Sequence, residues 1–161
     1  MRIRIYTDGA CSSNPGPGGW GIVINTSVKN IQKSGGEAST TNNRMELRAV
    51  IEAYKEILKR TKPGADIQFD IFSDSAYVVN TINNNWVEAW SCNGWQTVKG
   101  NDVKNRDLWE EFQNLRKEVR KRGVPVIIHK IKGHDGNTFN ELADELAKAE
   151  SIKLKEGAAN E

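Results

Sequence analysis

A single glutamate within an apolar helix face constrains this chain more than any other feature. From residue 43 to about residue 59, apolar residues recur every three or four positions, which is typical of a helix with one buried face (Ala49, Val50, Ala53, Tyr54, Ile57 and Leu58). With about 100° of rotation per residue, Glu46 points the same way as Val50 and Ile57. A carboxylate directed into a core is costly unless it is paired or holds a metal ion. Alternatively, Asn43 and Glu46 form a capping box at the helix start.

The size and composition of the chain predict one ordinary globular domain. The chain has 161 residues, of which 37% are hydrophobic and 27% charged, and a net charge of +2 argues neither for nor against nucleic acid. Cys11 and Cys92 lack the spacing of metal ligands and indicate a reducing cytosol. No apolar run is long enough to span a membrane, and the amino terminus lacks the pattern of a signal peptide. We expect a single domain over residues 1–153, followed by a flexible tail at 154–161.

The order of periodic segments predicts an α/β fold that begins with a meander. Alternating patterns predict three strands with short connections, which favour antiparallel pairing (2–7, 20–25 and 31–35). The glycine- and proline-rich stretch between the first two strands predicts a loop (11–19). Two further strands and three further helices follow the Glu46 helix (strands 67–72 and 125–131; helices 75–82, 106–122 and about 138–153).

Acidic residues follow two of the predicted strands. Asp8 and Asp74 each stand at a strand end, so parallel neighbouring strands would bring them to the same edge of the sheet. Each is equally well interpreted as a turn aspartate or a helix N-cap. Asp144 lies beside the apolar stripe of the last helix, ten residues after His134. Together with Glu46 these acids offer only oxygen ligands, which suit Mg²⁺ or Mn²⁺ better than zinc.

The segment from residue 84 to 104, called here the tryptophan excursion, differs in composition from the rest. Trp86, Trp90 and Trp95 lie among polar residues, with Lys99 and Lys104 as the only cations. The tryptophans form either the apolar side of a small excursion or a platform beside a nucleic-acid backbone. The following helix carries a basic cluster that we interpret as a solvated face (Arg116, Lys117, Arg120, Lys121 and Arg122).

Four separated motifs, taken together, resemble type I ribonuclease H of bacteria. They read DGAC from Asp8, TTNNRMEL from Thr40, SDS from Ser73 and KGH from Lys132, and the resemblance covers essentially the whole chain. It implies the ribonuclease H-like fold, in which helices flank a five-stranded mixed sheet of strand order 3-2-1-4-5. It also implies hydrolysis of the RNA strand of RNA–DNA hybrids, giving 5′-phosphate and 3′-hydroxyl ends.

The resemblance also implies roles for particular residues. Asp8, Glu46, Asp74 and Asp144 match the four catalytic carboxylates, which hold two Mg²⁺ ions in the family scheme, with Mn²⁺ as a possible substitute. In that scheme Asp8 bridges both ions, and Asp144 helps to hold the ion that activates the attacking water. His134 matches a mobile-loop histidine that assists proton transfer or product departure.

Substrate contacts are implied at two places. Cys11, Asn14, Thr41, Asn42 and Asn43 match positions beside the hybrid backbone, where small polar groups suit recognition of a 2′-hydroxyl without reading sequence. The tryptophan excursion resembles the basic handle of the family (Trp86, Trp90, Trp95 and Lys104). Uncharged residues stand where cations are common in that handle, so we expect a weaker electrostatic grip (Ser91, Cys92, Asn93, Gln96 and Gly100).

Two other functions remain open at this point. One is a module of the same fold that binds hybrids without cutting them, and the other is a nuclease related to integrases and resolvases, which share the fold and its acids. The four carboxylates and His134 argue against the first, and the TTNNRMEL and KGH motifs argue against the second. The expected partner is therefore a hybrid duplex, bound independently of sequence by a cytoplasmic monomer.

Overall fold

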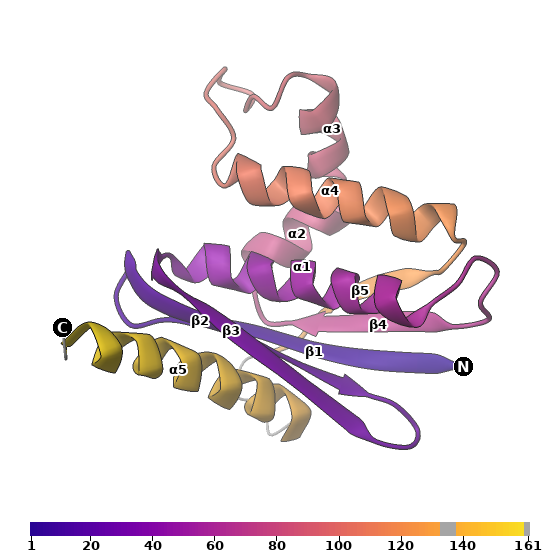
Figure 1. The fold of residues 1–161 in the computed structure, drawn as a ribbon. Coiled ribbons are helices and arrows are strands. Elements are labelled where there is room, and N and C mark those ends of the chain that lie inside the picture. The colour runs from indigo at the N-terminus through magenta and orange to yellow at the C-terminus, as the bar shows by residue number, and fades with distance from the viewer. Residues whose placement is uncertain (133–137, 160–161) are drawn as a thin grey trace.

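The computed structural model describes residues 1–132 and 138–159, which form one mixed sheet covered by helices (Figure 1). The sheet has five strands in the order β3-β2-β1-β4-β5, so the predicted fold is confirmed. The strands are β1 (Arg2–Cys11), β2 (Gly16–Asn25), β3 (Asn30–Thr40), β4 (Gln68–Ser73) and β5 (Val126–Lys130). The helices are α1 (Asn42–Arg60), α2 (Ala76–Asn83), α3 (Trp86–Cys92), α4 (Arg106–Lys121) and α5 (Thr138–Ala159).

Strand pairing follows the predicted meander at one side of the sheet. β1 pairs antiparallel with β2, and β2 pairs antiparallel with β3. β4 lies parallel to β1, and β5 lies parallel to β4, with helices in the connections. The carboxyl ends of β1 and β4 therefore meet at the same edge of the sheet, where open α/β sheets place their sites.

The predicted glycine- and proline-rich loop is shorter than expected. β1 continues to Cys11 and β2 begins at Gly16, and their pairing extends through Asp8 with Gly21 to Cys11 with Gly18. Glycine normally weakens a strand, but within one it marks a place where another backbone approaches closely. The prediction was wrong here because glycine serves packing in this part of the sheet rather than a turn.

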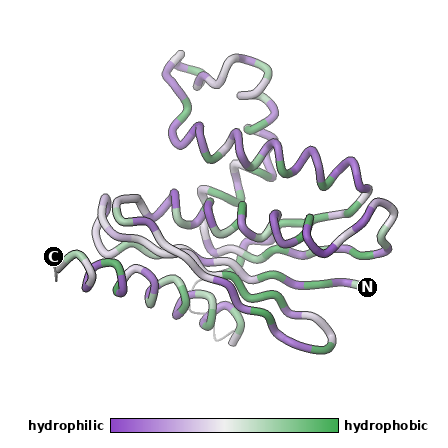
Figure 2. The backbone as a smooth tube through the Cα atoms, in the orientation of Figure 1, coloured by the Kyte–Doolittle hydropathy of each residue, from purple (hydrophilic) through white to green (hydrophobic). Residues whose placement is uncertain are grey.

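The two faces of the sheet carry different helices. α1 and α4 lie over one face, and α5 runs along the other (Figure 1). The larger core fills the first side, and a smaller cluster around Tyr6, Val23 and Ala143 fills the second. Hydrophobic residues are concentrated along the central strands and recur along the helices (Figure 2). None of the helices within the described residues combines the length and apolar character that crossing a membrane requires.

Helix α5 lies directly against the backbone of β2. A Cβ atom at Gly21 would stand 2.6 Å from the carbonyl oxygen of Ala143 and 2.7 Å from the Cβ of Leu146, so a larger residue would push the helix away. α5 also extends to Ala159, beyond its predicted end at about Lys153. Leu154, which the prediction placed in the tail, contacts β3 beside Gly36. This apolar contact gives the additional helical turns a surface to pack on.

The tryptophan excursion contains α3 and a loop that returns to α4. Trp95 is buried, Trp90 packs edge-to-face on Trp109 at 6.3 Å between ring centroids, and Trp86 is exposed. The expected solvated face of α4 is wrong at one position, since only 4% of Arg116 is exposed. Its Nη2 lies 2.7 Å from Oε1 of Glu88, so α3 supplies the countercharge that allows this guanidinium to be buried.

Candidate active site

Asp8 lies near the carboxyl end of β1, and only 4% of it is exposed. It pairs across the sheet with Gly21 of β2, and the backbone N–H of Gly9 donates a hydrogen bond of 2.9 Å to its Oδ1. This N–H is the backbone donor that the structure describes for the Asp8 carboxylate. One hydrogen bond offsets only part of the cost of burying a charge, so most of the compensation has to come from other groups.

Glu46 reaches Asp8 from the second turn of α1. The helix begins at Asn42 and is capped by Thr41, whose Oγ1 accepts a hydrogen bond from the N–H of Arg44 at 3.2 Å. The capping-box interpretation of Asn43 and Glu46 is therefore wrong. Only 5% of Glu46 is exposed, as its place in the apolar stripe predicted.

A glycine allows α1 to meet β1 at this point. A Cβ atom at Gly9 would stand 2.4 Å from the backbone nitrogen of Glu46 and 2.4 Å from the carbonyl carbon of Met45. Both are backbone atoms, which cannot rotate away as a long side chain can. The start of α1 therefore rests on the strand one residue beyond Asp8, and this contact sets the distance between the two carboxylates.

Asp74 completes a group of three acids. It follows β4 at the same edge of the sheet, and Ser75 rather than Asp74 caps α2 by accepting a hydrogen bond from the N–H of Val78. The alternative in which Asp74 is the N-cap is therefore wrong. One carboxylate oxygen from each of Asp8, Glu46 and Asp74 lies within 4.8 Å of the other two.

Asp144 approaches Asp8 from α5, on the other face of the sheet. The contact is close enough for Asp144 to raise the pKa of Asp8. Asp144 is not among the three mutually close acids, and its Oδ2 lies 2.9 Å from Nζ of Lys148, one turn further along the helix. Lys148 escaped the sequence analysis, although a lysine four residues after an aspartate on a predicted helix is a recognisable pairing signal.

The buried acids hold their protons unusually strongly. Burial, opposed by an interaction with Glu46 and reinforced by the charge of Asp74, raises the pKa of Asp8 to about 7. Burial, together with the charges of Asp8 and Asp74, also raises the pKa of Glu46 well above its usual value. Without a cation, like charges at this distance cannot all be ionised at neutral pH.

The donor set fits a hard divalent cation. Within the described part of the chain, Oε2 of Glu46 is buried and has no hydrogen-bond partner. A buried acceptor without a partner is rare and requires an explanation, and a metal ion is one that its neighbours support. Carboxylate oxygens are the ligands that Mg²⁺ and Mn²⁺ prefer, and the described acids place no sulfur or imidazole among them.

Most of the residues predicted to contact substrate backbone form one surface beside Asp8. The N–H of Asn42 donates a hydrogen bond of 2.9 Å to Oδ1 of Asn14, which joins the β1–β2 turn to the start of α1. Asn42 and Asn43 are exposed, while Thr41 is partly engaged as the helix cap. Sγ of Cys11 lies 3.4 Å from the carbonyl oxygen of Thr40, so it belongs to the same surface.

The remaining predicted residues lie elsewhere or outside the described residues. The tryptophan excursion exposes Trp86 and Lys104, whereas Trp95 packs into the core and carries the guanidinium of Arg106 at 6.0 Å from its ring. Trp90 and Trp95 therefore serve packing, whatever their part in substrate binding. His134 and its neighbour Asp135 lie outside the described residues.

Arg44 is a second residue whose part the sequence analysis missed. Its guanidinium donates to both carboxylate oxygens of Asp107 at 2.9 and 2.7 Å and to Oδ1 of Asn105 at 3.3 Å. These bonds tie the first turn of α1 to the first turn of α4, and so join the surface beside Asp8 to the tryptophan excursion. Its place inside TTNNRMEL was the only signal in the sequence.

Comparison with known proteins gives consistent matches over nearly the full length. The sequence model of the RNase H family matches residues 1–152. A ribonuclease H from Syntrophomonas wolfei is 47% identical over 146 residues, covering 91% of this chain and 93% of that protein. A ribonuclease H from Chlorobium chlorochromatii is 46% identical over 154 residues, covering 94% of this chain and 96% of that protein.

Solved structures resemble this fold as well. LC9-RNase H1, a type 1 RNase H with the type 2 active-site motif, is 30% identical with a TM-score of 0.75, covering 95% of this chain and 73% of that one. LC11-RNase H1, solved in complex with an RNA/DNA hybrid, is 25% identical with a TM-score of 0.70, covering 94% of this chain and 97% of that one.

Proposed function

Because the chain belongs to the ribonuclease H family, we propose that Asp8, Glu46, Asp74 and Asp144 are the residues with which it cuts its substrate. The protein is an endoribonuclease that hydrolyses the RNA strand of RNA–DNA hybrids. The observation that carries the proposal is the group of three carboxylates within 4.8 Å at the sheet edge, with a buried oxygen of Glu46 that has no described hydrogen-bond partner.

These acids would hold two Mg²⁺ ions when the hybrid is bound, and Mn²⁺ could substitute. Bound divalent cations supply positive charge to the scissile phosphate and lower the pKa of a coordinated water molecule. Asp8 stands between Asp144 on one side and Glu46 with Asp74 on the other, so it is the residue able to serve both ions. Lys148, whose Nζ lies 2.9 Å from Oδ2 of Asp144, would neutralise this carboxylate in the absence of cations.

The surface beside Asp8 would hold the hybrid backbone through Cys11, Asn14, Thr41, Asn42 and Asn43. Amide and hydroxyl groups can recognise a 2′-hydroxyl and the shape of the minor groove without reading bases. The bond between Asn14 and Asn42 supports this role because it fixes the two segments in one orientation before substrate arrives.

Further contacts would come from the tryptophan excursion and from His134. In the tryptophan excursion, the exposed Trp86 and Lys104 are the residues best placed to meet the duplex, with Trp90 and Trp95 holding the element in shape. We assign His134 the role of assisting proton transfer or product departure, as the family resemblance implies. The sparse cations of the excursion support the expectation of a weak electrostatic grip.

We also propose that residues 1–153 act as one domain and that the protein works as a cytoplasmic monomer. The single sheet supports one domain, because α1, α2 and α5 pack on it directly and α3 and α4 pack on α2 and α1. Cys11 and Cys92 are both free, which fits a reducing compartment. Sedimentation of the protein with and without a hybrid tests whether it is a monomer. A monomer sediments as one copy when free and as one copy per duplex when bound to a short hybrid.

Cleavage of a labelled hybrid by the Asp144→Asn variant tests the proposal. We expect wild type to cut in Mg²⁺ and to stop in EDTA. Asp144→Asn should lose at least about a hundredfold in turnover while still binding the hybrid, because a charged ligand to the catalytic cations is removed. The matched control is Glu145→Gln, which removes a charge from the exposed neighbouring position of the same helix.

Several outcomes would contradict the proposal. Near-normal turnover of Asp144→Asn would remove this residue from the catalytic group. Binding of the hybrid without cleavage by wild type in either Mg²⁺ or Mn²⁺ would favour the non-catalytic module. Efficient cutting of duplex DNA or of a four-way junction in place of the hybrid would favour the integrase- and resolvase-like nuclease.

A further inference from the structure

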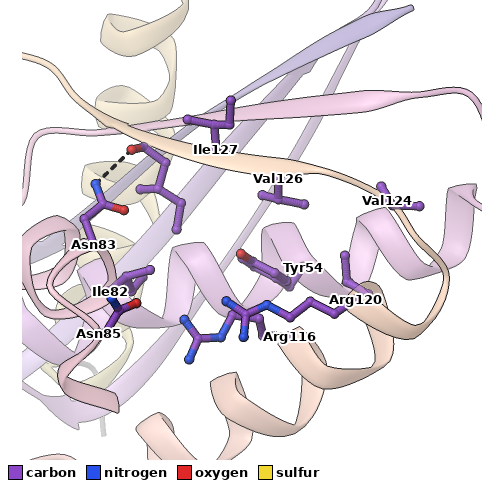
Figure 3. A pocket seen from close by; sticks show the side chains of 11 residues that line it. Tyr54, Ile82, Asn83, Asn85, Arg116, Arg120, Val124, Val126 and Ile127 are labelled. Carbon is purple, nitrogen blue, oxygen red and sulfur yellow. Dashed lines mark hydrogen bonds between the residues drawn. The ribbon is translucent and has the colours of Figure 1, made fainter. Parts of the chain in front are cut away.

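A pocket of about 250 Å³ lies between α4 and the edge strand β5, away from the carboxylates (Figure 3). Its apolar wall comes from α2, α4 and β5 and the turn between them (Ile82, Val119, Val124, Val126, Ile127 and Ile128). Its polar lining is Tyr54, Asn83, Asn85, Arg116 and Arg120. None of these residues belongs to the proposed active site or to the surface beside Asp8, and Asn85 alone lies in the tryptophan excursion.

The pocket has a buried floor and an exposed rim. Tyr54, Ile82, Val119 and Ile128 are buried, whereas Asn83, Asn85, Ile127 and Arg120 are exposed at the opening. Asn83 is held in place, since its Nδ2 donates a hydrogen bond of 3.1 Å to the carbonyl oxygen of Ile128 (Figure 3). An apolar wall with a few fixed polar groups is typical of a site for a small molecule.

Arg116 is the unusual residue of the lining. Its side chain is only 5% exposed, and its Nη2 donates to Oε1 of Gln113 at 2.6 Å and lies 2.7 Å from Glu88. Its Nε, however, is buried and has no hydrogen-bond partner among the described residues. A guanidinium N–H can only donate, so a ligand that relieves this position must offer an acceptor.

The charges at the pocket favour an anion. Arg116 and Arg120 are the charged side chains of the lining, and both point into the space between α4 and β5 (Figure 3). Glu88 faces them from α3 at 2.7 and 3.6 Å and neutralises one of the two charges. One positive charge is left over, on the exposed side chain of Arg120 at the opening of the pocket.

We propose that this pocket, called here the Arg116 pocket, binds a small organic monoanion that joins a carboxylate to a compact apolar body. The carboxylate would meet the guanidinium groups of Arg116 and Arg120, and the body would lie against Val119, Val126 and Ile128. The volume admits a body of about one aromatic ring. The carboxylate cluster of the proposed active site repels the same ligand, so binding there does not compete.

Titration of the full chain, labelled at its isoleucine and valine methyl groups, tests the Arg116 pocket by nuclear magnetic resonance. The probe is benzoate, and its neutral control is benzamide, which has nearly the same shape. We expect benzoate to shift the methyl signals of Ile82, Val119 and Ile128 in a saturable manner. Benzamide should bind at least about tenfold more weakly, because a hydrogen bond to a charged partner is worth about that factor.

Variants of α4 identify the groups that bind the probe. Arg120→Gln should weaken benzoate binding about threefold, as expected for one exposed ion pair, and Arg116→Gln at least about tenfold. Lys117→Gln is the matched control, because it removes one charge from an exposed position of the same helix and should change nothing. If Arg116→Gln does not fold, the affinity of Arg120→Gln for benzoate still tests whether the guanidinium groups bind the carboxylate.

Each remaining outcome overturns the proposal. Benzoate that shifts none of these methyl signals up to solubility would show that the pocket takes no such ligand. Equal binding of benzoate and benzamide, or an unchanged affinity in Arg120→Gln, would show a merely apolar cavity. Equal shifts with inorganic phosphate alone would show a site for simple anions that does not use the apolar wall.

Discussion

Replacing Asp8 by asparagine should make the metal-free protein more stable while abolishing its activity. In the folded chain, burial and the neighbouring acid Asp74 raise the pKa of Asp8 to about 7, from 3.8. In the unfolded chain the same carboxyl group is solvated and separated from its neighbours. In the folded protein Asp8 therefore either keeps its proton or is ionised at the free-energy cost of a buried charge. Asparagine carries no charge and avoids both.

The size of the effect follows from the pKa difference. The rise from 3.8 to about 7 is about 3 units, which corresponds to about 4 kcal/mol at neutral pH. Asparagine also loses the interaction with Glu46 that partly stabilises the carboxylate, so we expect about half of this amount, or about 2 kcal/mol. For a domain of this size, a gain of that order raises Tm by about 4–8 °C.

The direction of the pKa shift of Asp8 determines the pH range over which wild type loses stability. Below pH 3.8 Asp8 is protonated in both states, so its ionisation costs the native state nothing. Between about pH 4 and about pH 7 the unfolded chain ionises and the folded chain does not, and wild type loses stability through this interval. The difference in the free energy of unfolding between Asp8→Asn and wild type should therefore grow over the same interval and level off above it.

Denaturant titrations in EDTA from pH 4 to pH 8 measure this difference. The control is Asp66→Asn, an exposed residue before the amino end of β4, at the opposite end of that strand from Asp74, which should show no such growth. Adding Mg²⁺ should stabilise wild type more than Asp8→Asn, because the variant lacks a ligand. An Asp8→Asn variant that is less stable than wild type in EDTA at pH 7 would refute the reasoning and make Asp8 a structural turn residue.

Three further predictions concern packing, charge and substrate grip. Gly9→Ala should destabilise the fold by about 1–3 kcal/mol and lower turnover at least tenfold in a hybrid-cleavage assay, since its Cβ would stand 2.4 Å from backbone atoms of α1. Asp70→Asn should cost about 1–3 kcal/mol at pH 7, because a guanidinium and an imidazole donate to this buried carboxylate, and they outweigh burial to lower its pKa. That cost should vanish in denaturant titrations as the pH falls through the lowered pKa. Val98→Lys should steepen the salt dependence of hybrid binding by about 0.7–0.9 in the log–log slope, whereas Val28→Lys, at a valine that is also exposed but lies on the β2–β3 turn, should not. Equal slopes for the two variants would show that the tryptophan excursion does not contact the substrate.

The fold was predictable because its local signals agree with one another. Short apolar segments bounded by turn residues identified all five strands, and short connections identified the meander from β1 to β3. The strand order came from the family resemblance, since periodicity alone does not say which strands are neighbours. The wrong boundaries lie where glycine serves close packing within a strand, as at Gly18 and Gly19 of β2, and where one apolar residue, Leu154, prolongs a helix.

The candidate site was predictable to different degrees for different residues. Glu46 was found because helical periodicity placed a charge among apolar residues, and its burial bears out that geometry. Asp8 and Asp74 needed the additional premise that their strands are parallel neighbours. The pairing of Lys148 with Asp144 follows an i, i+4 spacing that the sequence contains, whereas the burial of Arg116 depends on its distance from Glu88 on another helix, which no local pattern contains.

The group of acids is costly for the fold, and backbone packing holds it together. Gly9 brings α1 onto β1, and Gly21 brings α5 onto β2, so Asp8 is approached from both faces of the sheet at one level. Neither contact involves a carboxylate group. The acids are therefore positioned by the packing of helices on strands, which stabilises the fold. The repulsion among the acids can then remain in the native state without separating them. Because these backbone contacts hold the acids in place before any cation arrives, little of the cation's binding energy has to be used to assemble the site.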